Sequence, residues 1–295
     1  MPTVLVPLDE TAFAESILPD AEQLAGPSGR LVLIYVAAHP EQAADVERYL
    51  SNEAQLLQVR DYRVTIKVLV GGDIPRAVDE GVTHLDAQMV AVATHGTHDG
   101  RLGRGSIAWK TLAHSPVPIV LRHNQSVRSL DEPVPDQIRI MVPLDGSPRA
   151  EQAVPMASAL ATQWAGSLLL ARMADDSASG QASLDRIAGT LTVPVQTVVR
   201  RGSPGEALTE LVTEQEITHV VMTSHGRTGL SRMIAGDVAA TLIDHLSLPI
   251  IVIPSLAQAA QETSPSSTHP TAAPAAAVPV ASLADQQNDS FALPA

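Results

Sequence analysis

The chain contains no cysteine, so neither a disulfide framework nor a thiolate metal site is available to it. This absence fits a reducing compartment. The N-terminal stretch MPTVLVPLDE has no basic segment before its apolar residues and does not resemble a signal peptide, so we expect a cytoplasmic protein. No apolar run approaches the ~18 residues that a membrane-spanning helix needs, and no membrane association is expected.

Aromatic residues make up only 2% of the chain, whereas hydrophobic residues make up 45%. The core must therefore be aliphatic, which favours strands buried under helices. Basic residues are also scarce: 19 Lys and Arg stand against 32 Asp and Glu, for a net charge of −13. Because nucleic-acid binding needs a basic footprint, no nucleic-acid partner is expected. A nucleotide pocket is still allowed, since backbone N–H groups can bind phosphate locally.

An internal repeat is the main feature of the chain. TVLVPLDETAFAESIL at 3–18 matches RIMVPLDGSPRAEQAV at 139–154, and SPVPIVLR at 115–122 matches LSLPIIVIP at 246–254. The same order of matching segments indicates a duplicated domain. We predict a first domain over residues 1–125, a linker over 126–137 and a second domain over 138–255. The Ala-, Pro- and Ser-rich residues 256–295 are predicted to be a disordered tail.

Each copy alternates short apolar runs with segments of helical periodicity. This alternation predicts an α/β fold with a parallel sheet and right-handed crossovers. The predicted strands are 3–8, 30–37, 62–70, 87–94 and 117–122, then 138–144, 167–173, 194–200, 218–223 and 249–253. The main predicted helices are 11–25, 40–59, one starting near Pro75, 106–114, 148–162, a reduced one at 182–191, 204–215 and 237–246.

Ligands of such sheets bind at the carboxyl ends of the strands, where the strand order reverses. Asp9 and Asp145 end the first strand of each copy. Either carboxylate could accept hydrogen bonds from ribose hydroxyls, but a helix N-cap is the slightly favoured reading. Val36 and Met173, at the end of the second strand of each copy, could flank a base or could simply be core residues.

A glycine-rich loop follows the fourth strand in each copy, THGTHDGRLGRGS at 94–106 and SHGRTGLSRMIAGD at 224–237. Glycines let the backbone approach an anion, and the N–H groups of the next helix point at it. The alternative is a loop that only makes the turn. The candidate anion-binding residues are Gly96, Gly105 and Ser106 in the first copy, and Gly226, Gly236 and Asp237 in the second.

The repeated histidines His95 and His225 suggest a metal at first sight, but no third ligand is evident. We predict no metal, and we expect these loop histidines to donate to backbone or phosphate. The loops also lack the G-x-x-x-x-G-K-[ST] pattern of a Walker ATPase, and no G-x-S-x-G elbow indicates a hydrolase. With no general base evident, no catalytic residue is assigned and any ATPase activity would be slow.

VPLDGS at 142–147, MTSHGRTGL at 222–230 and LPIIVIP at 248–254 resemble the universal stress protein family. The resemblance covers residues 1–255. It implies two tandem Rossmann-like domains of the adenine nucleotide alpha hydrolase-like type, each a five-stranded parallel sheet flanked by helices. It also implies a stress-response regulator that binds ATP or a related adenine nucleotide, with Mg²⁺ as a possible companion.

In the family's pattern the adenosine end would be held by Pro7, Asp9 and Val36. Gly96, Gly105 and Ser106 would hold the phosphates, with His95, Arg101 and Arg104 nearby.

Both copies depart from the family's ATP pattern, G-x2-G-x9-G-S/T. The first glycine is Ala93 in the first copy and Thr223 in the second, and the final hydroxyl position of the second copy is Asp237. A carboxylate there would cap its own helix and repel phosphate. The first copy is thus predicted to be the better site. Asp145, Met173, His225, Gly226, Gly236 and Asp237 would then form a degenerate second one.

These departures leave an alternative function open, a scaffold that binds no nucleotide and acts through protein–protein contacts. The resemblance further implies pairing through the fifth strands, PIVLR and PIIVI. These apolar edge strands need cover. We predict that they pair within one chain, and association of two chains into a homodimer stays open.

Overall fold

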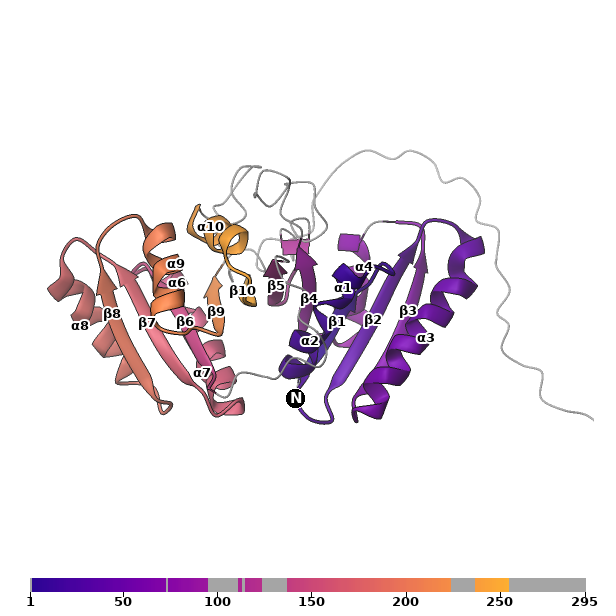
Figure 1. Ribbon diagram of the computed structural model, residues 1–295, viewed down its shortest axis with the longest axis horizontal. Helices are drawn as coiled ribbons and strands as arrows, with labels where there is room; N and C mark the ends of the chain where they lie inside the picture. Colours follow the sequence, from indigo (N-terminus) through magenta and orange to yellow (C-terminus); the bar gives the residue numbers. More distant parts are fainter. Residues whose placement is uncertain are drawn as a thin grey trace, which may run out of the picture. The chain divides into compact units, whose positions relative to one another are not determined.

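The structure is a computed structural model, and it describes residues 2–72, 74–94, 111–112, 115–123, 137–223 and 237–254. All of these residues belong to one compact unit, which spans Met1–Thr263. Ten strands form a single sheet in the order β3-β2-β1-β4-β5-β10-β9-β6-β7-β8 (Figure 1). Among the described strands the pairing is parallel within each half of the sheet, and the central pair β5–β10 is the one antiparallel pair.

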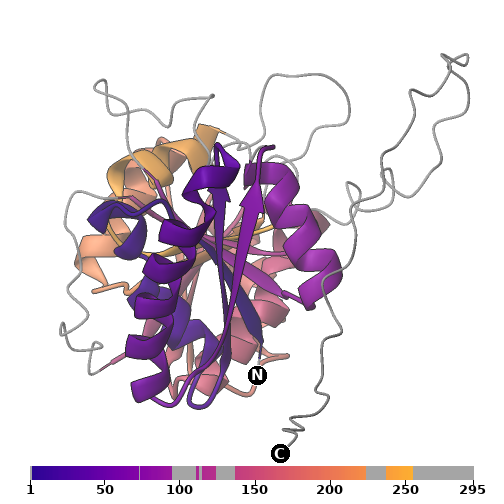
Figure 2. The ribbon, with the colours of Figure 1, turned by 90° about the vertical axis from the view of Figure 1, so that its right-hand side faces the viewer.

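The first half of the sheet is built from residues 3–123. Its elements are β1 (Thr3–Pro7), α1 (Ala12–Glu15), α2 (Leu18–Ala25), β2 (Arg30–Ala37), η1 (Pro40–Gln42), α3 (Ala43–Val59), β3 (Arg63–Val70), α4 (Ile74–Leu85), β4 (Met89–Thr94) and β5 (Ile119–His123). Helices α2 and α3 cover one face and α4 the other, as Figure 2 shows for α3 and α4 on either side of the strands.

The second half repeats this plan. Its elements are β6 (Arg139–Leu144), α6 (Pro148–Glu151), α7 (Ala153–Gln163), β7 (Ser167–Met173), α8 (Ser177–Ala188), β8 (Val195–Arg200), α9 (Pro204–Glu214), β9 (His219–Thr223), α10 (Asp237–His245) and β10 (Ile250–Ile253). The predicted fold class, tandem five-stranded parallel sheets flanked by helices, is confirmed. None of the helices in the described ranges is long and apolar enough to cross a bilayer.

Three helix predictions differ from the structure. The single helices expected over 11–25 and 148–162 are each split in two, α1 with α2 and α6 with α7. The split follows from Pro19 and Pro155, which have no N–H to bond the turn before them and so lie in the first turn of a new helix. The helix expected at 182–191 starts earlier, at Ser177, because Asp176 caps it by accepting from the N–H of Ala178 at 3.1 Å.

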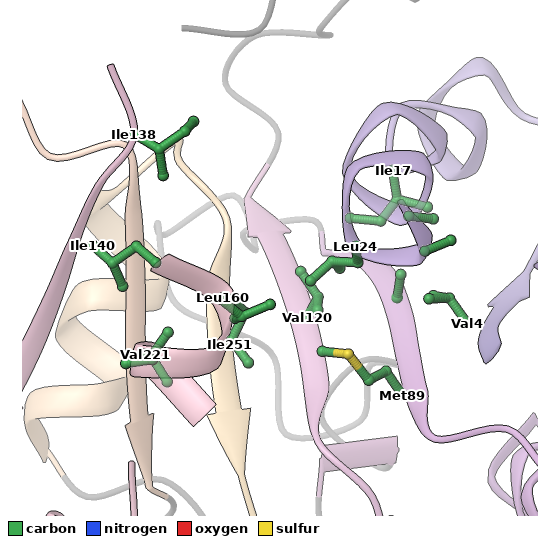
Figure 3. Packing of buried hydrophobic residues seen from close by; sticks show 14 of the residues in the cluster. Val4, Ile17, Leu24, Met89, Val120, Ile138, Ile140, Leu160, Val221 and Ile251 are labelled. Atoms are coloured by element: carbon green, nitrogen blue, oxygen red, sulfur yellow. The ribbon is translucent and has the colours of Figure 1, made fainter. Parts of the chain in front are cut away.

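The central pair β5–β10 confirms that the two fifth strands pair within one chain. Val120 faces Ile251 across the antiparallel ladder, and each occupies the same place in its own half. Side chains from α2 and α7 pack over this pair, with Leu24 near Val120 and Leu160 near Ile251 (Figure 3). The pairing covers both apolar edges, so the core is continuous from one half to the other.

Polar contacts reinforce the same junction. Arg122, only 6% exposed, bonds Asp20 of α2 through both Nε and Nη2, and its Nη1 donates to the carbonyl of Ser247 at 2.8 Å. Further along, the Trp164 indole N–H donates to the Gln23 carbonyl at 3.1 Å. Arg122 therefore satisfies a buried carboxylate of the first half and a loop carbonyl of the second half at once.

Breaking the Asp20–Arg122 pair should destabilise the chain strongly. Asp20→Asn or Arg122→Met alone should cost about 3–5 kcal/mol, because each leaves an uncompensated buried charge. The double variant Asp20→Leu, Arg122→Met should recover most of that loss. Urea unfolding followed by circular dichroism measures all three, with Arg48→Gln as the control. Arg48 lies in an exposed pair with Asp45, and such pairs contribute little. A double variant as unstable as the sum of the singles would contradict this account.

Candidate functional site

The candidate site lies at the carboxyl ends of β1, β2 and β4 in the first half. The strand order reverses between β1 and β4, which is where doubly wound sheets open a crevice for ligands. Pro7 is buried at the end of β1, paired with Ile34, and Asp9 follows as an exposed residue. Val36, half-buried near the end of β2, is paired with Leu69 of β3. The structure therefore places Pro7, Asp9 and Val36 at one edge of the sheet.

Asp9 does not cap the helix, so the favoured reading of this residue was wrong. The cap is Thr11, whose hydroxyl oxygen accepts from the Ala14 N–H at 3.1 Å. Asp9 instead holds Thr11 in place, because its Oδ1 accepts from both the backbone N–H and the hydroxyl of Thr11. No hydrogen bond to Oδ2 of Asp9 occurs among the described residues, and the side chain belongs to an exposed residue.

The second half builds the same turn. Asp145 accepts from the Ser147 N–H at 2.8 Å, and the Ser147 hydroxyl oxygen accepts from the Ala150 N–H at 3.1 Å. Asp145 thus orients the cap residue rather than capping α6 itself. Met173 packs half-buried beside the core, as Val36 does in the first half. The turn after the first strand is therefore a shared structural device of both halves.

A hollow of about 290 Å³ opens beside Val36, between the end of β3 and α4. Leu69, Val70 and Ala77 give it apolar walls, and the exposed Arg76–Glu80 pair stands at its rim. Gly71 and Gly72 adopt φ of 72° and 96°, in the left-handed region that favours glycine. A Cβ on either glycine would meet no atom within 4 Å, so the backbone borders open space. The sequence did not identify this glycine pair as part of a site.

Two tyrosines lie on the opposite face of β2, which sequence reasoning also missed. Tyr35 and Tyr49 stack edge to face with ring centroids 6.4 Å apart, and the Tyr49 hydroxyl donates to Glu15 at 2.8 Å. Burial, then the Glu15 hydrogen bond and nearby carboxylates, raises the pKa of Tyr49 far above its usual value. Burial, then Glu10 and Asp9, raises the pKa of Tyr35. This face of the edge is therefore acidic and aromatic.

Most loop residues predicted for the site lie outside the described residues. These are His95, Gly96, Arg101, Gly105 and Ser106 in the first copy and His225, Gly226 and Gly236 in the second. Asp237 is the first residue of α10, and its predicted role as a cap stays a prediction. Thr94 ends β4, so the first loop starts at the same sheet edge as Asp9. Within the described ranges, no three His, Asp or Glu side chains are arranged to hold a metal ion.

The fold defines a class of protein, the tandem α/β proteins with parallel sheets whose strand order reverses between the first and fourth strands. The sequence profile of the Universal stress protein family matches residues 1–123 and 188–254. The chain therefore belongs to the universal stress protein family.

Individual relatives agree with this assignment. A universal stress protein of Mycolicibacterium smegmatis is 28% identical over 189 residues, which are 57% of this chain and 62% of that protein. The chain thus spans less than two thirds of that relative. A universal stress protein of Archaeoglobus fulgidus superposes with a TM-score of 0.69 at 18% identity, covering 86% of this chain and 96% of that one.

A Pseudomonas aeruginosa protein of unknown function gives a TM-score of 0.67 at 16% identity, covering 88% and 95% of the two chains. At these identities the two solved structures show a common fold.

Removing the Glu15 carboxylate should lower the pKa of Tyr49. Glu15→Gln takes away the negative charge and the charged acceptor that help to keep the Tyr49 hydroxyl protonated. Ultraviolet absorbance of tyrosinate against pH reports it, since the chain has only three tyrosines. Glu47→Gln, an exposed change on α3 with the same loss of charge, should leave the titration alone.

The same titration predicts how stability depends on pH. The pKa of Tyr35, Tyr49 and Tyr62 is raised in the folded chain. The folded state therefore keeps these protons where the unfolded chain loses them. The stability they contribute is present below about pH 10 and is lost as pH rises through the folded values. An unchanged curve in Glu15→Gln would show that Glu15 does not control Tyr49.

Proposed function

We propose that the chain is a stress-response regulator that binds an adenine nucleotide at the carboxyl edge of the first half. The hollow near Val36 carries the proposal, because it opens at the end of β3, on the same carboxyl edge of the sheet as Asp9. Its volume of about 290 Å³ is close to the lower limit of roughly 300 Å³ for small-molecule sites. It therefore suits a base alone, with the sugar and phosphates lying outside it.

The base would contact the walls that Leu69 and Ala77 provide, beside Val36. The ring could come close to the backbone at Gly71 and Gly72, since neither has a side chain and no atom stands where one would be. Two left-handed glycines in succession are the reason that this space stays open.

The ribose would lie toward Asp9. One carboxylate oxygen of Asp9 is fixed by Thr11, which orients the group, and the other is available to accept from sugar hydroxyls. The phosphates would then reach the loop that starts after Thr94. His95, Gly96, Arg101, Gly105 and Ser106 are the residues that we propose to hold them. This part of the proposal rests on the sequence and on the family resemblance.

The second half offers a poorer site in this proposal. Asp237 starts α10 where the family's pattern has a hydroxyl residue, and a carboxylate at a helix N-terminus repels phosphate. Ligand-dependent ordering of the first loop would then change which partner the protein contacts. The alternative is a scaffold without a nucleotide, favoured by Ala93 and Thr223 at the first glycine positions of the family's pattern.

Thermal unfolding with and without ATP and Mg²⁺ tests the proposal. ATP at 100 times its Kd should stabilise the full chain by about 2.7 kcal/mol. Asp9→Ala should remove most of this shift, whereas Asp145→Ala should keep it. The pair is matched, because both carboxylates hold the cap residue of a short helix in the same turn. Any loss of stability from the turn itself is therefore common to both variants.

Two results would count against nucleotide binding in the first half. The absence of a shift at millimolar ATP in the unmodified chain would leave the scaffold function. A shift that disappears in Asp145→Ala but persists in Asp9→Ala would move the site to the second half.

A further inference from the structure

The two halves differ most sharply at one equivalent position, on the sheet face that carries Tyr35. In the first half, Tyr35 comes directly after Ile34, the last residue of β2 that is paired with β1. Its counterpart in the second half is Arg172 of β7, which is paired with Leu144 of β6. Neighbouring strand residues point to opposite faces, and Met173 packs in the cluster that also holds Val36. Arg172 therefore lies on the face away from the degenerate nucleotide position.

The guanidinium of Arg172 lies directly against Gly146. A Cβ at position 146 would come within 2.5 Å of Nη2, 2.7 Å of Cζ and 2.9 Å of Nη1, so a side chain there would displace the guanidinium from this position. Gly146 also has φ of 83°, which the turn after β6 requires. The equivalent residue of the first half is Glu10, with φ of 64°. The second half thus replaces a tyrosine and a glutamate with an arginine and a glycine.

Arg172 has no anionic partner among the described residues. Its Nε is buried without a hydrogen bond, although the chain pairs Arg122, Arg186 and Arg200 with carboxylates. Four acidic residues lie near Gly146 or Arg172 in the sequence, and three of them are engaged elsewhere. Asp145 accepts from the Ser147 N–H, and Glu151 pairs with Arg186 at 2.6 Å. Asp176 caps α8, and Asp175 is exposed on the loop after β7.

We propose that Arg172 is the recognition residue of a phosphate-binding site at the carboxyl end of β6 and β7. A guanidinium presents a planar fork of N–H donors that matches two oxygens of a phosphate group. A cation with a buried, unpartnered N–H is stabilised when such an anion arrives. Because Gly146 has no side chain, the guanidinium can lie against its backbone. The site is independent of the nucleotide proposed for the first half.

Calorimetric titration of the full chain with inorganic phosphate tests the site. Phosphate should bind the unmodified chain, and Arg172→Gln should weaken Kd about tenfold or more, as expected for losing charged hydrogen bonds. Arg172→Lys should bind more weakly than the unmodified chain, because it keeps the charge and loses the fork. Gly146→Ala should also weaken binding, with folding checked by thermal unfolding.

The control is Arg201→Gln, which removes the same charge from an exposed arginine of the second half. It should bind phosphate like the unmodified chain. The proposal is overturned if the unmodified chain gives no heat with phosphate, or if Arg172→Gln and Arg201→Gln bind equally well. Titration with acetate separates the two oxyanion classes, and binding of acetate without phosphate would also overturn it.

Asp9→Ala distinguishes this site from the nucleotide site, since it should retain phosphate binding at Arg172 while losing the ATP shift. Arg172→Gln should show the reverse, an intact ATP shift without phosphate binding. Failure of one proposal therefore leaves the other standing.

Discussion

The antiparallel pair β5–β10 is the contact on which the rest of the structure depends. Two parallel sheets each end in an apolar strand, and each would expose an unpaired edge without the other. The register joins Val120 to its own counterpart Ile251, so the two halves meet with approximate twofold symmetry. The symmetry stops at the polar contacts, because Arg122, with its bonds to Asp20 and Ser247, corresponds to Ile253 in the other half.

Much of this architecture can be predicted, because the repeat is visible in short segments of the sequence. The two VPLD segments and the two proline-led apolar strands identify a duplicated α/β domain, and burial of those strands predicts their pairing. Prediction fails where a single residue overrides the periodicity. Pro19 breaks a helix whose apolar spacing continues, and Asp176 starts one where Ser and Gly predict little helix.

The polar contacts at the junction and at the sheet edge are harder to predict, since they join residues far apart in the chain. Asp20 and Arg122 are unremarkable charged residues in the sequence, and only the packing of α2 on β5 makes them a buried pair. Similarly, Tyr49 of α3 donates to Glu15 of α1, and Arg172 of β7 lies against Gly146, although each pair is far apart in the chain. Such contacts depend on tertiary packing, which cannot be predicted from the spacing of residues in the sequence.

The turn after the first strand is the same in both halves, so the presence of Asp9 does not by itself indicate a function. Asp145 makes the same bond to its cap residue in the half predicted to bind nucleotide poorly, so the local structure of the turn is reason enough for an aspartate at this position. A ligand role for Asp9 must therefore come from what surrounds it. The first half supplies the hollow at Gly71 and Gly72, whereas the second supplies the Arg172 guanidinium against Gly146, without an anionic partner in the described part of the chain. The same scaffold thus presents two chemically different edges, a hollow beside two glycines in one half and a guanidinium against a glycine in the other.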